Sequence, residues 1–517
     1  MTQRSDRLFA ALTLTFLALL SCDAVARRVE IRVIHTTDLH GHILPTRDYD
    51  GNENVGGLLR CSTLIRQLRA ERDNTLLVDS GDLFQGSPEG LLTGGEIMPR
   101  AMAWLKYDAW TLGNHEFDWG LHKLSPVVQG ATFSVLAANV RATPGNKTPL
   151  PAVAPYVIKE LDGVRVAIIG LITPGVPTWS LPDLLGPLEF RRSVESLKDI
   201  MPALREADPD VIILTTHQGY KDRGDDSANE INAIAKNFPE IDVILGGHTH
   251  KPMEHVMIGD TLYSQAGYHG IWLGCVDIAF DTVTREIIRK EARLLNVRTD
   301  VEQDPALAEF LKEDIDRARA YMAEEIGTAS AKITAAVDMK GNSPVQVLLA
   351  RAIKAASKAD VVLHGVLSED DLAAGAIRME HIWNIVPYEN RIGLLQLTAS
   401  EITAILEESA ARQGTIHLMG CYGMTFDVEK DTAGQVHVTN LRLPDGSLPH
   451  PRKRFKVAMN SYVLASGGER FPTVRRLVAI PECRLEVLNV DTRSAVIDYV
   501  KAHSPLDPAT LQGDGGR

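Results

Sequence analysis

Short apolar runs rich in β-branched residues recur along the N-terminal part of the chain, and polar or amphipathic stretches separate them. The runs cover residues 29–34, 75–78, 109–112, 133–137, 164–169, 211–214 and 241–245. Runs of this length and composition are typical of buried strands. Between them, residues 55–70 and 194–206 repeat Leu, Ile and Val at helical spacing. This alternation predicts a layered α/β or α+β domain built on a largely buried sheet.

A change of pattern follows this domain. Residues 304–326 form a charged, amphipathic sequence that predicts one helix, with a single apolar face made of Leu307, Phe310, Leu311, Ile315 and Ala318. Its position indicates a connector between two domains, and an ordinary surface helix of the first domain is the alternative. Beyond it, helical patterns at 344–357 and 399–412 alternate with strand patterns at 360–363, 392–397 and 454–459.

The length of 517 residues exceeds what one hydrophobic core normally organises. We therefore predict a two-domain α/β (α+β) protein with a linker helix and a smaller α/β C-terminal domain. The expected segments are a signal peptide (1–26), a first domain (27–300), the linker helix (301–330), a second domain (331–505) and a disordered tail (506–517) rich in Gly, Pro and Asp.

The N-terminus has the features of an export signal. Arg4 and Arg7 precede an apolar stretch at 8–20, and the small residues Ala-Val-Ala at 24–26 fit signal peptidase cleavage before Arg27. The apolar stretch is too short to span a bilayer, so no transmembrane segment is expected. The residues Leu-Leu-Ser-Cys at 19–22 resemble a lipobox, so a lipid anchor at Cys22 is the alternative processing. Either way we expect a periplasmic or cell-surface protein.

The net charge limits the classes of ligand. A formal charge of −13 argues against a broad electrostatic footprint for nucleic acid or an anionic membrane. An anionic small substrate would therefore need local positive charge, which bound metal would supply. Nothing in the sequence indicates the oligomeric state.

Five polar blocks carry the candidate chemistry, and each follows one of the apolar runs. They occupy residues 38–40, 81–82, 113–116, 216–218 and 247–250. Because the carboxyl ends of strands in an open α/β sheet form the usual ligand edge, these blocks are expected to meet there. In an extended strand, residues two apart point to the same side, so Asp38 and His40 converge if the chain stays extended.

Asp, His and Asn are ligands that hold pairs of divalent cations. One such residue beside a strand is more often a hydrogen-bonded structural group, and a lone Gly in these blocks would mark only a turn. The joint pattern instead predicts a two-metal phosphoesterase site. The carboxylate of Asp82 offers two oxygens that can bridge metals ~3.5–4 Å apart. Imidazole and carboxylate without thiolate favour Zn, Mn, Fe, Co or Ni.

Residues 29–300 resemble the calcineurin-like metallophosphoesterase family, in particular its 5′-nucleotidase branch. The similarity rests on HTTDLHGH at 35–42, GDLFQGS at 81–87, LGNHEFDWG at 112–120 and GGHTH at 246–250. It implies a four-layer β-sandwich flanked by helices and a relationship to bacterial periplasmic 5′-nucleotidases and UDP-sugar hydrolases.

The resemblance also implies roles for individual residues. One metal would be held by Asp38, His40, Asp82 and His250, and the other by Asp82, Asn114, His217 and His248. Zn, Mn or Co are the expected ions. His115 and Asp118 would form a catalytic dyad, in which a carboxylate orients an imidazole that donates a proton as charge develops. The implied reaction is in-line attack on phosphorus by metal-activated water, without a covalent intermediate.

The second domain resembles the C-terminal 5′-nucleotidase domain through MNSYVLASGGERF at 459–471. In that comparison Phe471 becomes the base-stacking aromatic, and Asn460 belongs to the same motif. The alternative is a core phenylalanine beside a Gly-rich turn.

Two segments depart from the family pattern. Residues 363–368, LHGVLS, lack the Arg that usually grips the substrate phosphate; Arg391 or Arg378 would have to compensate. Residues 418–422, LMGCY, replace the second stacking aromatic, with Met419 at the position itself and Tyr422 as the nearest ring. The candidate substrate-binding residues are therefore Phe471, Asn460, Tyr422 and Arg391.

The leading hypothesis is an exported dinuclear-metal phosphohydrolase that converts nucleoside 5′-monophosphates to nucleoside and phosphate. On the same fold, a 2′,3′-cyclic phosphodiesterase, a nucleotide-sugar hydrolase or another ester hydrolase is the alternative, because fold does not determine substrate. An alternative of a different class is a non-catalytic secreted binding protein, although the complete set of presumptive ligands argues against it.

Overall fold

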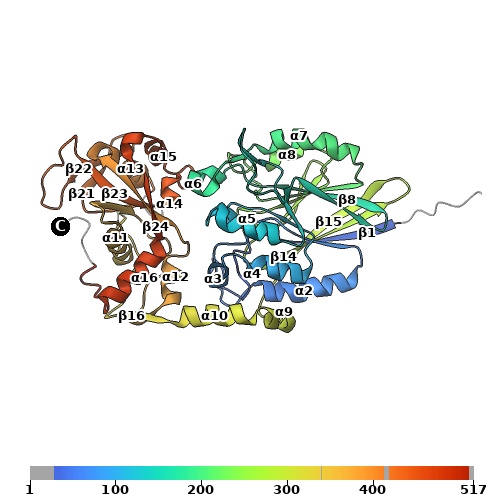
Figure 1. Cartoon of the computed structure of the whole chain (residues 1–517), viewed down its shortest axis with the longest axis horizontal. Helices are drawn as coiled ribbons and strands as arrows, with labels where there is room; N and C mark the ends of the chain where they lie inside the picture. The colour runs from blue at the N-terminus through green and yellow to red at the C-terminus, as the bar shows by residue number, and fades with distance from the viewer. Residues whose placement is uncertain (1–27, 339–340, 413–417, 512–517) are drawn as a thin grey trace, which may run out of the picture.

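The computed structural model describes residues 28–338, 341–412 and 418–511. Two domains lie side by side along the long axis, and a helical segment runs beneath both of them (Figure 1). The expected signal peptide and Cys22 lie outside the described residues. Among the described residues, no helix combines the length and apolar character that a membrane crossing requires.

Two sheets form the centre of the described N-terminal domain. The first sheet has the order β15 (Glu286–Asn296), β14 (Trp272–Asp281), β1 (Arg28–Thr36), β2 (Thr75–Asp79), β3 (Ala109–Thr111), β4 (Ser134–Leu136) and β6 (Val153–Ala154). The second has the order β12 (Pro252–Ile258), β13 (Thr261–Ala266), β11 (Val243–Gly246), β10 (Val211–Thr216), β8 (Val164–Leu171) and β7 (Tyr156–Leu161). The strands that precede the polar blocks run parallel within each sheet.

The alternating pattern of β1 shows how the layers form. Ile31 and Val33 face the second sheet and pack with Val166 and Ile213, whereas Ile34 faces the helices on the outer side. Helices α2 (Leu58–Glu71), α4 (Ile97–Leu105) and α5 (Leu121–Gly130) cover the first sheet, and α7 (Ser193–Glu206) and α8 (Ile231–Asn237) cover the second. The predicted four-layer sandwich is thereby confirmed.

Short elements fill the loops of this domain. They are the helices α3 (Pro88–Thr93), η1 (His115–Phe117), η2 (Val176–Thr178) and α6 (Pro182–Leu185), and the paired strands β5 (Val140–Ala142) and β9 (Leu188–Phe190).

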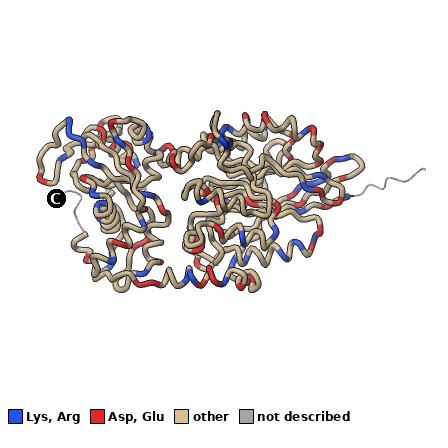
Figure 2. Tube along the Cα trace, viewed as in Figure 1, with Lys and Arg blue, Asp and Glu red and all other residues tan. Residues whose placement is uncertain are grey.

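The connecting segment is two helices instead of the single helix expected. Asp304 caps α9 (Pro305–Phe310) by accepting hydrogen bonds from the next helical turn, and the chain leaves helical geometry at Leu311 before α10 (Lys312–Ala323). The break rotates the apolar face, so Phe310 is 46% exposed while Leu311 and Ile315 are buried. Acidic and basic residues alternate along this segment (Figure 2).

A second α/β domain follows. Its sheet has the order β20 (Gly420–Tyr422), β17 (Val361–His364), β23 (Arg454–Asn460), β19 (Arg391–Thr398) and β24 (Glu486–Asp491). One face packs against α11 (Pro344–Ser357), α12 (Met379–Ile385) and α16 (Thr492–His503). The other face packs against α13 (Ala399–Ala410), α14 (Ser461–Leu464) and α15 (Pro472–Val478).

Peripheral elements complete this domain. Strand β16 (Glu325–Ala329) pairs with β18 (Gly375–Arg378), so the chain joins the second domain directly after α10. Strands β21 (Thr425–Lys430) and β22 (Val436–Arg442) form a separate hairpin, and η3 (Pro481–Cys483) precedes β24.

The chain after α16 does not become a disordered tail at Leu506 as expected. The amide of Leu506 donates to the carbonyl of Thr328 at 2.8 Å, and Leu506 and Leu511 are both buried in the second domain. Burial of these two leucines fixes the segment against the second domain, although its Gly, Pro and Asp content had predicted disorder. Residues 512–517 lie outside the described residues.

Candidate active site

The polar blocks meet at the edge of the N-terminal domain that faces the second domain. Asp38 and His40 follow β1, Asp82 follows β2, and Asn114 follows β3, while His217 and His248 follow β10 and β11 of the second sheet. All described parallel strands of each sheet end at this edge, which confirms the sequence expectation for the position of the blocks.

The reason why Asp38 and His40 converge differs from the expected one. Asp38 has φ 50° and His40 has φ 48°, so the chain turns through left-handed conformations and is not extended there. Asp82, His248 and His250 are also left-handed, with φ values of 59°, 71° and 57°. Such backbone is costly for residues other than glycine and clusters at functional sites. Tight turns, and not strand periodicity, therefore aim these side chains.

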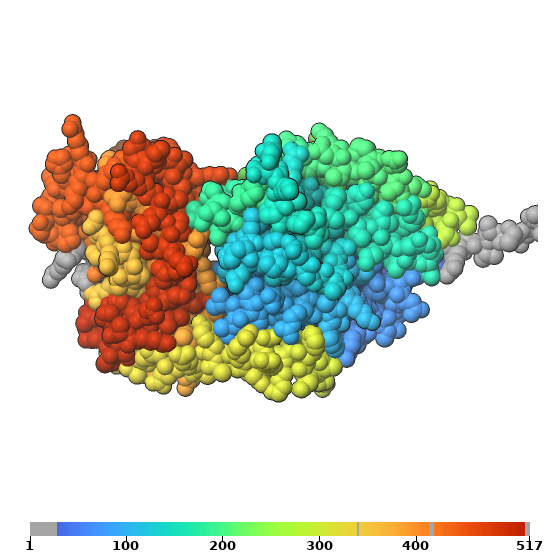
Figure 3. All heavy atoms as spheres, in the orientation of Figure 1, coloured from blue at the N-terminus to red at the C-terminus, as the bar shows by residue number. Residues whose placement is uncertain are grey.

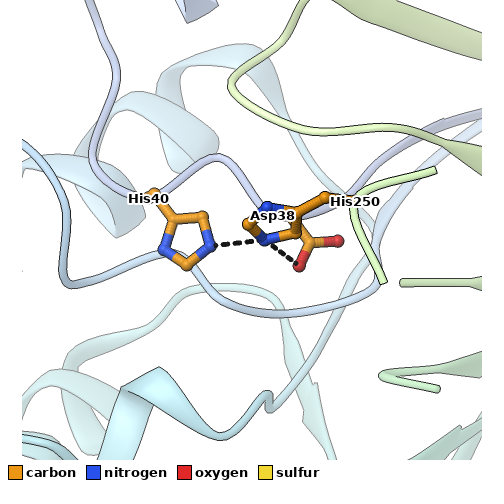
Figure 4. Close-up of side chains that lie close together, drawn as sticks. All are labelled: Asp38, His40 and His250. Carbon is orange, nitrogen blue, oxygen red and sulfur yellow. Dashed lines mark hydrogen bonds and ion pairs between the residues drawn. The ribbon is translucent and has the colours of Figure 1, made fainter. Parts of the chain in front are cut away.

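Asp38, His40 and His250 form the first cluster (Figure 4). The Nε2 atoms of His40 and His250 lie 3.0 Å apart, and His250 Nε2 lies 3.2 Å from Oδ1 of Asp38. His40 Nδ1 lies 2.7 Å from the main-chain oxygen of Gln85. Because a carbonyl oxygen only accepts, His40 Nδ1 carries the proton and its Nε2 presents a lone pair to the cluster.

Asp82, His217 and His248 form a second cluster beside the first. His217 Nε2 lies 2.9 Å from Oδ2 of Asp82, and its Nδ1 donates to the carbonyl of Ser80 at 2.8 Å. His248 Nδ1 lies 3.0 Å from Oδ1 of Asn114. Oδ2 of Asp82 is also 3.9 Å from Nε2 of His40, so this carboxylate lies between the two clusters.

These donor sets fit divalent metal ions. His217 Nε2 is buried and points toward Oδ2 of Asp82, and its ring is held in this orientation by the hydrogen bond from Nδ1 to Ser80. Burial raises the pKa of Asp82, but the neighbouring His217 and His115 outweigh it and hold that pKa well below its usual range. Each cluster combines deprotonated carboxylates with oriented imidazole nitrogens and contains no thiolate. Ligands of this kind suit divalent cations such as Zn, Mn or Co.

His115 and Asp118 lie within one turn, formed by η1, at the rim of the clusters. His115 Nδ1 is hydrogen-bonded to Oδ2 of Asp118, and the amide of His115 donates to Oδ1 of Asp82 at 2.8 Å. Burial by itself lowers the pKa of His115. The carboxylates of Asp118 and Asp82 raise that pKa by more than burial lowers it, to about 10. These two carboxylates therefore favour the protonated form of His115, which is the form that can donate a proton.

Glu116 is a structural residue of the site that the sequence prediction left out. Its buried carboxylate accepts hydrogen bonds from the amides of Gly113, Asp82 and Leu83, the last at 2.5 Å. It thereby joins the loop after β2 to the loop after β3. A carboxylate in the middle of the 112–120 motif was the available signal, but only the fold shows which amides it binds.

A cavity of about 350 Å³ extends from the clusters into the interface with the second domain. Figure 3 shows the two domains in contact along one seam, with the connecting helices across its lower end. From the N-terminal domain the lining includes Asp82, Asn114, His115, Asp118, His248 and His250. From the second domain it includes His364, Leu367, Tyr388, Met419, Asn460, Tyr462, Arg470 and Phe471.

Two of the four predicted substrate-binding residues reach this cavity. Asn460 and Phe471 line it, whereas Tyr422 and Arg391 are not among the described residues of its lining. Tyr422 lies on the far side of the sheet, where its ring is 5.2 Å from the ammonium nitrogen of Lys354. Arg391 Nη2 binds Oδ2 of Asp183 at 2.7 Å, at the rim of the domain interface. Strand register and an interdomain ion pair thus direct both side chains elsewhere.

Arg470 was not predicted and is the only Lys or Arg among the described residues that line the cavity. Its Nη1 atom donates to the hydroxyl of Tyr462 at 2.7 Å, and the side chain is half-buried. Leu367, from the segment that lacks the expected Arg, lines the same cavity. The signal was present in the 459–471 motif, where Arg470 stands directly before Phe471.

Comparison with known proteins agrees with this geometry in both domains. The model of the calcineurin-like phosphoesterase family matches residues 31–252, and that of the 5′-nucleotidase C-terminal domain matches residues 325–476. The chain belongs to the 5′-nucleotidase family. The predicted enzyme class is thereby confirmed: the protein is a metal-dependent phosphoester hydrolase.

Individual relatives have low sequence identity to this chain, but the similarity extends over most of its length. The chain is 26% identical to Endonuclease YhcR of Bacillus subtilis over 95% of its own length, which spans 41% of that relative. It is 26% identical to a 5′-nucleotidase of Vibrio parahaemolyticus, with 92% of this chain and 90% of the relative covered. The crystal structure of a 5′-nucleotidase precursor from Thermus thermophilus shares the fold, with 22% identity, coverage of 92% and 96%, and a TM-score of 0.70.

Proposed function

We propose that this protein is a dinuclear-metal 5′-nucleotidase that hydrolyses nucleoside 5′-monophosphates to nucleoside and phosphate. The observation that carries the proposal is one cavity that joins the clusters to the second domain. Its lining includes His250 of the first cluster, Asp82 and His248 of the second, the His115 and Asp118 dyad, and Arg470 and Phe471. A phosphate at the clusters would leave the nucleoside directed at the second domain.

The proposed ligand sets follow the two clusters. Asp38, His40 and His250 would hold one ion, His217, His248 and Asn114 the other, and Asp82 would contribute to both because it lies between them. Zn, Mn or Co suit these ligands. Divalent ions bound there lower the pKa of water and neutralise charge on the phosphoryl oxygens.

The side chains of the protein would divide the remaining work. His115, oriented through Nδ1 by Asp118, would donate a proton to the leaving oxygen. Arg470 would bind a nonbridging oxygen of the phosphate with its guanidinium, in place of the Arg that the 363–368 segment lacks. Phe471, with Asn460 beside it in the lining, would provide the face on which the base stacks.

A phosphate-release screen tests the proposal. Nucleoside 5′-monophosphates, 2′,3′-cyclic nucleotides and nucleotide sugars would each be assayed with Zn, Mn and Co. The nucleoside 5′-monophosphates should be hydrolysed with the highest kcat/KM. A preference for cyclic nucleotides or nucleotide sugars would assign the alternative specificity, and no release from any substrate with any ion would reject an enzyme in favour of a binding protein.

Export is proposed from the sequence alone, because the segment that directs it lies outside the described residues. Cleavage before Arg27 should give a protein released with the periplasmic fraction. Cys22→Ser distinguishes the two processing routes, since it abolishes lipid labelling only if Cys22 is the anchored residue.

A further inference from the structure

The segment between α12 and β19 of the second domain reaches across the interface to the dyad of the first. The ring of Tyr388 stacks on that of His115, with centroids 5.7 Å apart and an interplanar angle of 12°. The next residue, Glu389, accepts a hydrogen bond at 3.0 Å from the side-chain amide of Gln85, which belongs to the first domain. Two consecutive residues of the second domain thus contact His115 and Gln85 of the first domain.

The contact with Glu389 determines how the amide of Gln85 is oriented. A carboxylate accepts hydrogen bonds, so the NH₂ group of Gln85 must face Glu389 and the amide oxygen must face the opposite way. That oxygen lies 3.1 Å from His115 Nδ1, the nitrogen that is also bonded to Asp118. Two acceptors therefore hold the Nδ1 proton in place and direct Nε2 of His115 toward the cavity.

A buried arginine holds the segment from behind. Arg493 is 1% exposed, its Nε donates to the carbonyl of Val386 at 2.8 Å, and its Nη2 donates to that of Pro387 at 2.5 Å. Its Nη1 pairs with Glu389, and the guanidinium lies 3.4 Å from the ring centroid of Trp383. A buried guanidinium is tolerated only when its donors are satisfied, and here residues 386–389 satisfy them.

We propose that residues 386–390, here named the dyad clamp, position the catalytic histidine from the second domain. Glu389 and Arg493 are positioning residues that act on His115 through Gln85. This inference rests on the proposed role of His115 as proton donor. It follows that the dyad is fully oriented only when the two domains are together, so proton donation is coupled to domain closure.

Leaving-group dependence tests the clamp. Removing the orientation of His115 should lower kcat for a nucleoside 5′-monophosphate, whose alkoxide needs a proton, by about 10–100-fold. Because nitrophenolate needs little protonation, kcat for p-nitrophenyl phosphate should fall less than about 3-fold. The test variants are Gln85→Leu and Glu389→Gln. Gln85→Leu keeps the main-chain oxygen that binds His40, so its metal content should equal that of the wild type.

Matched controls break other interdomain contacts. Asp183→Asn removes the ion pair with Arg391, and Asp370→Asn removes the one with Arg47 at 3.1 Å, both between partly exposed side chains. Neither should change the ratio of the two rates. Thermal unfolding gives a readout without substrate: the double variant Gln85→Leu/Glu389→Gln should lose less in Tm than the sum of the two single variants, because both remove the same contact.

The outcomes separate the clamp from the proposed function. Equal loss on both substrates, unchanged rates on both, or additive losses of Tm in an active protein would overturn the clamp alone. A wild-type protein that hydrolyses neither substrate would overturn the proposed function and the clamp's role with it. If Glu389→Gln fails to fold because Arg493 loses its carboxylate, the Gln85→Leu rate ratio decides.

Discussion

His40 and His250 face each other through their Nε2 atoms, 3.0 Å apart, although they are far apart in sequence. Nδ1 of His40 is committed to a carbonyl, so its Nε2 presents a lone pair at the position where Nε2 of His250 and the carboxylate of Asp38 also converge. A divalent cation bound at that position would be coordinated by all three side chains.

Metal removal should therefore destabilise the protein as well as inactivate it. Chelation followed by calorimetry should lower the stability by about 2.7 kcal/mol relative to metal at one hundred times its Kd, and readdition should restore it. His250→Ala should reduce the bound metal measured by mass spectrometry, whereas His255→Ala, at an exposed histidine, should not. Identical Tm values with and without chelator would contradict a metal site.

His115→Ala should separate catalysis from metal binding. Loss of the proton donor should lower kcat for a nucleoside monophosphate by about 10²–10⁴-fold. Metal content should not change, because His115 is outside both proposed ligand sets. His122→Ala, at an exposed histidine of α5, serves as the control and should keep full activity. Loss of bound metal from the His115→Ala protein would reassign His115 as a ligand.

Phe471→Leu should weaken nucleoside recognition. Loss of ring stacking, worth about 0.5–1.5 kcal/mol, should raise KM for AMP about 3–10-fold and leave KM for p-nitrophenyl phosphate unchanged. Phe455 lies in the same apolar core but outside the cavity, so Phe455→Leu should lower Tm without that selectivity. Equal effects of the two substitutions on KM would mean that Phe471 only packs.

Arg470→Gln should weaken phosphate binding. A charged hydrogen bond contributes about 1.5–3 kcal/mol, so KM for AMP and the inhibition constant of inorganic phosphate should both rise about 10–100-fold. Arg476→Gln, on the exposed side of α15, should change neither. An unchanged inhibition constant in Arg470→Gln would show that another group binds the phosphate.

Asp277 provides a pH-dependent test of stability remote from the site. Burial raises its pKa, but the hydrogen-bonded Arg32 outweighs this and lowers it below 3.8. A carboxyl with a lowered folded-state pKa stabilises the protein above its unfolded pKa and loses that contribution as pH falls.

Asp277→Asn should therefore cost about 2 kcal/mol near pH 7, less than the 3–5 kcal/mol of a fully buried pair because Arg293 is partly exposed. The difference in unfolding free energy from the wild type should shrink as pH falls below about 4. A difference that stays constant down to acid pH would exclude this ion pair as its cause.

Much of the fold was predictable because its signals are local. The run at 211–214 predicted β10 (Val211–Thr216), and the pattern at 344–357 predicted α11 with the same bounds. Burial on one or both faces produces these periodicities wherever a strand or helix forms. The positions of His217 and His248 at strand ends were predictable for the same reason.

The sequence by itself determined the elements, the order of the polar blocks and, through them, the class of reaction. Only the tertiary structure decided that left-handed turns aim Asp38 and His40, that Arg470 and not Arg391 reaches the cavity, and that Glu389 touches Gln85. Local sterics and periodic burial specify a helix or strand. A contact between residues separated by 304 positions depends on how two finished domains pack, which no short stretch of sequence encodes.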